Sequence, residues 1–240
     1  MSPVRLACLA GAAIAACSGV AVASGAFAPP EGCTGFLTVQ SRNCKLSNHY
    51  ICEGDPPGDQ WRVDFGQYGP YFVSRIDRET QWVESISLTD GLRTVLLPDP
   101  VDPASFSGLL VTGTDTFDFR QLRDDGLETR VRGFDTLTGR KVVIDGVTLE
   151  ETSFEFRETL ADGTQIARAR GREYISREWR MFLSGPSEWD DGEGWLPMDF
   201  SPVEFIRPGE PGFFSTQPKY ECDALMSQAD PAKENRHEPL

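Results

Sequence analysis

Residues 33–52 read CTGFLTVQSRNCKLSNHYIC, and their pattern indicates a β-hairpin. TGFLTVQS and CKLSNHYI both have the character of strands, and the dipeptide RN between them suits a two-residue turn. With such a turn Ser41 faces Cys44, and the pairing continues without a break along both strands. This register places Cys33 directly opposite Cys52.

The same register sorts the hairpin side chains onto two faces. The face expected to lie against the core carries Cys33, Leu37, Val39, Cys44, Leu46, Tyr50 and Cys52. The opposite face carries Thr34, Thr38, Gln40, Lys45, Ser47 and His49. Because Cys44 lies on the core face, it is free to bond to Cys222 and to tie the C-terminal part of the chain to the hairpin.

The cysteine count fits two disulfides. Two of the six cysteines lie within residues 1–23, and the other four form an even set. An even number of cysteines in an exported chain favours a disulfide framework. We expect Cys33 to pair with Cys52 and Cys44 with Cys222, although the count alone permits other pairings.

A zinc site is the alternative for this stretch, with Cys33, Cys44, His49 and Cys52 as its ligands. These residue types bind zinc, but their spacing lacks the close Cys-x-x-Cys pairs of structural zinc sites. The expected register also points His49 away from the cysteines. We therefore predict neither a metal nor a cofactor.

The first residues have the pattern of a secretory signal. MSPVR supplies a charged start, LACLAGAAIAACSGVAVA an apolar run, and AVA at 21–23 a cleavage site with small residues. We expect residues 1–23 to be removed and the mature protein to be periplasmic or secreted. Alternatively, IAAC resembles a bacterial lipobox, in which case Cys17 would carry a lipid anchor.

The chain is strongly acidic. Its formal net charge is -14, and removal of residues 1–23, which contain Arg5, makes it -15. Such a charge repels nucleic acid and anionic lipid headgroups, so we predict no nucleic-acid partner. No later stretch is apolar for long enough to span a bilayer, so we expect no transmembrane segment in the mature chain.

Turn dipeptides divide the chain into short alternating segments. Asp-Gly, which tolerates the positive φ of tight hairpins, stands at 90–91, 125–126, 145–146, 162–163 and 191–192. Examples of alternation are Trp61, Val63 and Phe65; Phe154 and Phe156; and the run Ile175, Trp179, Met181 and Leu183. Period two at such intervals predicts a single all-β, antiparallel domain over residues 24–228.

The expected sheet has about nine to eleven strands, given the usual strand lengths. It would be a curved sheet or an open or closed barrel, with a sandwich as the alternative. Short helical turns are expected from Asp102 to Leu110 and in CDALMSQ, which begins at Cys222. Five prolines in 195–220 indicate a cover that runs across the sheet, and the polar residues 229–240 are expected to be disordered.

No catalytic motif is evident. The chain has only two histidines and lacks a Gly-x-Ser-x-Gly elbow, which argues against a Ser-His-Asp triad. The sharpest acidic cluster is EWDDGEGW at 188–195, which would suit calcium or sugar binding. Its simpler interpretation is a turn at 191–192 with two tryptophans packed beneath it.

A row of arginines follows one strand, at Arg168, Arg170 and Arg172. Such a row can bind a carboxylate or phosphate. More often it pairs with acids on a neighbouring strand, and the nearby stretch ETSFEFRET supplies several. We therefore expect cross-strand ion pairs.

Aromatic side chains at alternate positions are the candidate ligand-binding residues. The set comprises Trp61, Phe65, Trp82, Phe117, Phe119, Phe154, Phe156 and Trp179. If the sheet closes around them, they line a pocket for a lipid-like or aromatic ligand. Otherwise they fill the core.

These features predict a class of function. We expect a noncatalytic periplasmic binding or carrier protein for a hydrophobic small molecule or an envelope component. An exported antiparallel sheet with little helix resembles, in layout alone, envelope carriers of the lipocalin and lipoprotein-carrier type. The alternatives are an envelope interaction or scaffold module that binds a protein partner, and a carboxylate-based hydrolase.

Overall fold

The computed structural model describes residues 25–222. Within that range thirteen strands form one antiparallel sheet, and the only α-helix is α1 (Phe106–Thr112). No helix in this part of the chain is long and apolar enough to cross a membrane. The predictions for the signal at 1–23, the helical turn after Cys222 and the tail at 229–240 lie outside the described residues.

The strands run in chain order. They are β1 (Cys33–Ser41), β2 (Lys45–Cys52), β3 (Gln60–Gly66), β4 (Gly69–Ile76), β5 (Trp82–Ser87), β6 (Arg93–Leu96), β7 (Thr114–Arg123), β8 (Glu128–Ile144), β9 (Val147–Leu160), β10 (Gln165–Ser176), β11 (Met181–Asp190), β12 (Leu196–Asp199) and β13 (Pro202–Ile206). Consecutive strands from β1 to β12 pair with each other, and β13 pairs with β1. The all-β, antiparallel prediction is confirmed, but the strands are more numerous than expected because β6, β12 and β13 are short.

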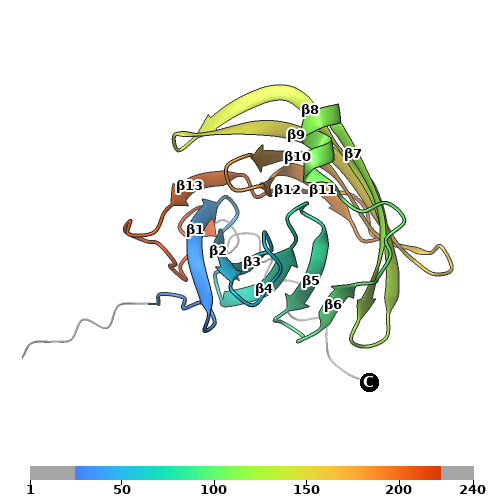
Figure 1. The fold of residues 1–240 in the computed structure, drawn as a ribbon, viewed down its shortest axis with the longest axis horizontal. Coiled ribbons are helices and arrows are strands. Elements are labelled where there is room, and N and C mark those ends of the chain that lie inside the picture. Colours follow the sequence, from blue (N-terminus) through green and yellow to red (C-terminus); the bar gives the residue numbers. More distant parts are fainter. Residues whose placement is uncertain (1–24, 223–240) are drawn as a thin grey trace, which may run out of the picture.

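The sheet is not closed, because β12 and β13 are its two edges. It is nevertheless rolled, so that β1–β6 curl opposite the longer strands β7–β11 (Figure 1). Leu37 and Val39 of β1 pack with Leu183 of β11 and Phe205 of β13. The Phe205 N–H donates a hydrogen bond of 2.9 Å to Asp145 at the β8–β9 turn. The two ends of the sheet are therefore held near each other.

The Asp-Gly dipeptides mark turns between consecutive strands, as expected. Asp145 and Gly146, which join β8 to β9, have φ values of +47° and +75°. Two positive φ values are what a type I′ hairpin turn requires. The sequence pattern did not predict one turn, at residues 177–180, which separates β10 from β11. The run from Ile175 to Leu183 is thus two strands, and its alternation across the turn is coincidental.

The first hairpin keeps its expected ends but not its expected register. Cys33 is opposite Cys52, and the two are joined by a disulfide. The turn, however, contains three residues, so Ser41 pairs with Lys45 rather than with Cys44. A β-bulge at Phe36 compensates for the shift by adding one residue to β1.

The bulge divides the residues that were expected to share one core face. Leu37 is opposite His49 and lies inside the roll. Leu46 and Tyr50 belong to another cluster on the opposite face. The prediction of a single apolar face is therefore wrong, since both faces of β1 and β2 are covered.

The chain after β13 covers the outer face of β1–β3. Phe214 packs in the cluster that contains Leu46 and Tyr50. Thr38 Oγ1 accepts a hydrogen bond of 2.8 Å from the Phe214 N–H, and Gln40 Nε2 donates one of 3.1 Å to the Gln217 carbonyl. The proline-rich segment 195–220 thus supplies the two edge strands and then this cover, which the disulfide between Cys44 and Cys222 anchors.

Helix α1 begins later than expected. Ser105, not Asp102, is the N-cap, and its side chain accepts a hydrogen bond of 3.0 Å from the Gly108 N–H. Asp102 instead accepts one from the hydroxyl of Thr116 on β7. The buried side of α1, with Phe106, packs against β10 inside the roll.

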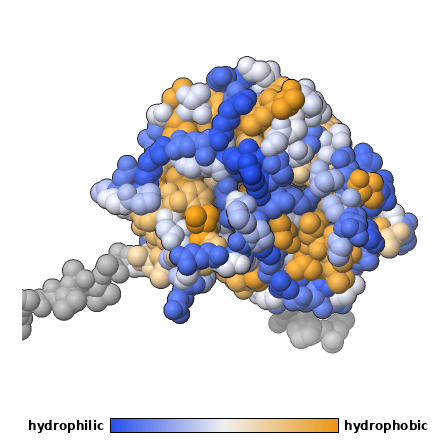
Figure 2. Space-filling view, in the orientation of Figure 1, coloured by the Kyte–Doolittle hydropathy of each residue, from blue (hydrophilic) through white to orange (hydrophobic). Residues whose placement is uncertain are grey.

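Exposed apolar side chains are scattered. Figure 2 shows hydrophobic patches on this side that are separated by hydrophilic residues. The most exposed aliphatic residues, Val101, Val111, Val143 and Leu196, come from different parts of the chain. Single exposed apolar residues are ordinary on a protein surface and indicate no docking face.

Candidate ligand-binding site

Two adjoining cavities lie inside the roll, between β3–β5 and β7–β11. The inner cavity has a volume of about 140 Å³ and the outer one about 460 Å³. Arg62, Ile76 and Trp82 line both cavities and form the boundary between them. The volume of the outer cavity, even without the inner one, falls within the range of small-molecule sites, roughly 300–1,000 Å³.

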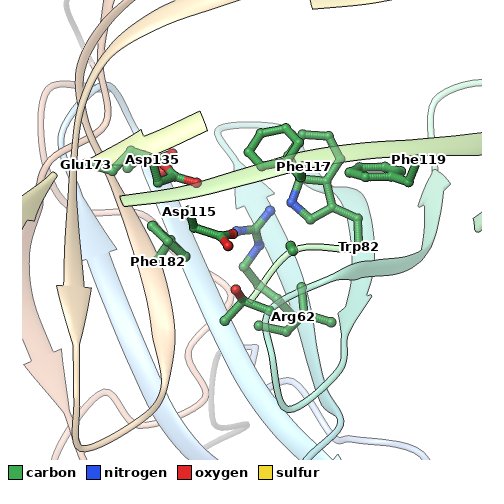
Figure 3. Close-up of a pocket in the computed structure, with 12 residues that line it drawn as sticks. Arg62, Trp82, Asp115, Phe117, Phe119, Asp135, Glu173 and Phe182 are labelled. Atoms are coloured by element: carbon green, nitrogen blue, oxygen red, sulfur yellow. The ribbon is translucent and has the colours of Figure 1, made fainter. Parts of the chain in front are cut away.

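One wall of the inner cavity is aromatic (Figure 3). It contains Trp82 of β5 and Phe117 and Phe119 of β7, whereas Phe182 of β11 lies on the side of Asp115 (Figure 3). Trp82 meets Phe119 edge to face, with ring centroids 5.7 Å apart. Gly133 lies opposite Phe117 on β8, and a Cβ there would be 2.6 Å from the Phe117 ring. The glycine therefore lets this ring lie flat against the sheet.

The aromatic residues selected from the sequence occupy different places. Trp82, Phe117 and Phe119 line the inner cavity. Phe156 on β9 packs edge to face on Trp82, with centroids 5.5 Å apart, and Phe154 stacks on Phe156. These five lie on the inner side of the roll.

The other three lie elsewhere. Trp61 and Phe65 belong to the outer cluster beneath the C-terminal cover. Trp179, in the β10–β11 turn, packs on Phe205 with ring centroids 5.2 Å apart. Sequence reasoning missed Phe182, because the misread run 175–183 assigned its neighbours on either side to the inner face.

Charged side chains face the aromatic wall. They come from four strands and are Arg62, Asp115, Asp135 and Glu173 (Figure 3). Asp115 and Asp135 are direct partners across β7 and β8. Asp115 also accepts a hydrogen bond of 2.9 Å from the Ser105 N–H, so the N-cap of α1 positions it. Nothing in the sequence distinguished these acids from the solvent-exposed ones.

Asp135 and Glu173 have unusual surroundings. Asp135 is only 9% exposed, and within residues 25–222 neither carboxyl has a hydrogen-bond or ion-pair partner. Burial, with repulsion from Glu173 and Asp115, raises the pKa of Asp135 to about 8. Burial also raises the pKa of Glu173 to about 7, against the attraction of Arg62 and Lys45. The pair therefore retains a proton near neutral pH.

A second buried charge cluster lies beside the cavity and is compensated. Asp64 is 2% exposed; its carboxylate lies 3.2 Å from Lys45 Nζ and 3.1 Å from Arg62 Nε. The Ser47 hydroxyl donates a hydrogen bond of 2.6 Å to it. Burial alone would raise the pKa of Asp64, but Arg62, Lys45 and this hydrogen bond lower it overall.

His49 lies in the same cluster and is neutral. Burial and the nearby Arg62 lower the pKa of His49 to about 3. Its Nε2 atom has no hydrogen-bond partner within residues 25–222. The expected zinc alternative, which used His49, fails because its three cysteines are all in disulfides.

The outer cavity combines an apolar floor with charged walls. Its apolar lining includes Phe72, Leu127, Ile166 and Trp189. Arg75 also borders it, but Arg75 is directly opposite Trp61 and lies over the Trp61 ring on the outer face of the sheet. There it pairs with Asp59 at 2.8 Å and with Glu84 at 3.3 Å. An apolar body of a ligand would therefore contact the floor of the outer cavity.

The acidic stretch 188–195 forms a turn, as the simpler interpretation held, but Trp189 packs on Phe156 of β9, with ring centroids 5.8 Å apart. Asp190 accepts hydrogen bonds of 2.8 and 3.0 Å from the Gly192 and Gly194 N–H groups. Arg168 and Arg170 lie over the ring of Trp195, at 4.4 and 4.1 Å from its centroid.

The arginine row finds its acids on β11 rather than on β9. Arg168 pairs with Asp190 at 2.7 Å and Arg170 with Glu188 at 2.8 Å. Although Glu155 of β9 is directly opposite Arg170, its closest cation is Arg157. Arg168 and Arg170 thus form cross-strand ion pairs, with different partners from those expected.

No group of three or more metal-binding side chains in residues 25–222 is arranged to hold a metal ion. No protein-family model, curated protein or solved structure matches the chain.

Proposed function

We propose that this chain is a binding protein that carries a small amphipathic ligand in the two adjoining cavities. The observation that supports this most is their shared boundary of Arg62, Ile76 and Trp82. A ligand that crosses this boundary can place an apolar body in the outer cavity and a polar group in the inner one. Pockets with an apolar lining and a few convergent polar groups are typical of ligand sites.

The protein acts outside the cytoplasm in this proposal. Two disulfides favour an oxidising compartment. The pattern of residues 1–23 suits export. Intact mass of the exported product tests this: cleavage after Ala23 leaves an unmodified chain, whereas lipidation at Cys17 adds acyl mass.

A ligand carrier suits the surface better than a scaffold module does. The two free edge strands are short, and β13 begins with Pro202, which cannot donate a ladder hydrogen bond. Exposed apolar residues are scattered rather than gathered on one face. The interior therefore offers more binding surface than the exterior.

Native mass spectrometry of the exported protein, before and after delipidation, tests ligand binding. The delipidated protein is then titrated with a panel of amphipathic and aromatic compounds by calorimetry. Trp82→Ala should weaken binding by roughly tenfold, because loss of one well-packed aromatic contact costs 1 kcal/mol or more. Trp195→Ala, which removes a tryptophan outside both cavities, is the matched control. Absence of co-purified mass together with absence of binding across the panel would overturn the proposal.

A further inference from the structure

The inner cavity contains more acids than bases. Three carboxyls, Asp115, Asp135 and Glu173, line it together with one cation, Arg62. Arg62 is already paired with Asp64 at 3.1 Å. Arg62 also attracts Glu173, so this one cation is shared and does not balance the three carboxyls.

Lys45 does not correct the imbalance, because its ammonium lies 3.2 Å from the same Asp64 carboxylate. Asp135, 9% exposed and aimed into the cavity, has no partner within residues 25–222. A buried carboxylate without a partner is unfavourable and must either bind a proton or meet a cation. The cavity thus has an unfilled place for positive charge.

The opposite wall favours the same kind of group. Trp82, Phe117 and Phe119 line the cavity, and Trp82, which is 40% exposed, offers most of the open ring surface. Aromatic faces attract organic cations. The inner volume of about 140 Å³ is close to that of a cavity that holds benzene, about 150 Å³. An ammonium group with small substituents fits this space.

We propose that the ligand is an organic cation with an apolar body. Its ammonium group lies in the inner cavity, between Asp135 and Glu173 on one side and Trp82 and Phe117 on the other. The apolar body passes the boundary and lies on the floor of the outer cavity. This inference rests on the proposed ligand-binding function and specifies the chemical class of the ligand.

Binding of a cation displaces the proton that the acid pair retains. The pKa of Asp135 is raised to about 8 and that of Glu173 to about 7, so the pair is partly protonated at pH 7. The ionisable groups that act on the pair are Asp115 from β7, Arg62 from β3 and Lys45 from β2, and the two cations also interact with Asp64. His49 is neutral, and Lys45 and Arg62 both pair with Asp64. The acid pair loses its proton as the pH rises from 6 to 9, so its affinity for a cationic ligand should increase over this range.

Three compounds with one alkyl chain test the inference: decyltrimethylammonium, decanol and decanoate, titrated below their micelle concentrations at pH 8. We expect the cation to bind roughly tenfold or more tightly than the other two, as for a charge-assisted contact. Asp135→Asn and Glu173→Gln should remove this preference and preserve decanol binding. Asp191→Asn and Glu193→Gln, exposed acids of the β11–β12 turn, are the matched controls and should preserve the preference.

The outcomes separate the two proposals. If decanol or decanoate binds as tightly as the cation, the inference is wrong and the ligand-binding function stands. If none of the three binds, the inference is wrong, and the co-purified mass and the compound panel described above decide whether the ligand-binding function stands. Calorimetry of the wild-type protein in buffers of different ionisation enthalpy avoids dependence on the variants, because cation binding at pH 7 should release a proton. Cation binding without proton release would overturn the inference.

Discussion

Cys44, in the first hairpin turn, is bonded to Cys222, which lies 178 residues further along the chain. The bond joins the end of the C-terminal cover to the strands that this cover protects. Phe214 of the cover packs with Leu46 and Tyr50 in the cluster on the outer face of β1–β3. Loss of this bond would therefore release the cover from the sheet.

The long-range disulfide should stabilise the fold more than the hairpin disulfide. Their sequence separations are 178 and 19 residues, so the chain-entropy account gives about 5 and about 3 kcal/mol. Urea unfolding of Cys44→Ala/Cys222→Ala and of Cys33→Ala/Cys52→Ala measures the two losses. A larger loss of unfolding free energy for Cys33→Ala/Cys52→Ala than for Cys44→Ala/Cys222→Ala would contradict this order.

Gly133→Ala should destabilise the protein by about 1–3 kcal/mol, the usual cost of overpacking. The new Cβ would lie 2.4 Å from the Glu155 carbonyl oxygen and 2.6 Å from the Phe117 ring. Because Phe117 lines the inner cavity, ligand affinity should fall as well. Gly54→Ala is the control, since no heavy atom lies within 4 Å of its Cβ. Equal unfolding free energies for the two variants would contradict the close packing at Gly133.

Asp64→Asn should cost about 3 kcal/mol, because it leaves the largely buried Lys45 and the partly exposed Arg62 without their counter-ion. The lowered pKa of Asp64 sets the pH dependence of this difference. Its stabilisation is present above the ordinary aspartate pKa and is lost as the pH falls through the lower folded pKa. The difference measured by urea unfolding at pH 7 should therefore narrow in strong acid. Asp162→Asn, in an exposed turn, should unfold like the wild type.

Local features of this sequence were more predictable than non-local ones. The Asp-Gly turns depend on only two residues and their backbone freedom, as at Asp145 and Gly146. The β10–β11 turn uses Arg180 at φ +48° and contains neither glycine nor proline, so it has no such signal. The bulge at Phe36 compensates for the three-residue turn at 42–44. The alternation of apolar residues alone reveals neither the bulge nor the length of this turn.

The binding site was only half predicted, because alternation identifies two faces but not which face is inside. On β3, Trp61 and Phe65 pack under the C-terminal cover, whereas Arg62 and Asp64 lie within the roll. The sheet is covered on both sides here, so the polar face becomes the interior. Asp135 was missed for another reason: it shares the inner face with Phe117 and Phe119, and nothing in the sequence distinguishes it from the exposed acids.

The buried acid pair should make the protein without ligand less stable as the pH rises. Burial raises the pKa of Asp135 to about 8 and that of Glu173 to about 7, above ordinary values of about 4. The folded state thus holds protons that the unfolded state releases. This contribution is complete below pH 4 and is lost as the pH rises through about 7 to 8.

Asp135→Asn isolates that contribution, because asparagine is neutral at every pH in this range. Relative to the wild type, the variant should gain on the order of 1 kcal/mol or more of stability between pH 5 and pH 9. Urea unfolding at pH 5, 7 and 9 measures this gain, and Asp191→Asn should follow the wild type throughout. A cationic ligand at pH 9 should stabilise the wild type but not Asp135→Asn, since only the wild type presents the carboxylate that the cation neutralises. Parallel stability curves for the wild type and Asp135→Asn would show that this carboxyl ionises normally in the folded protein.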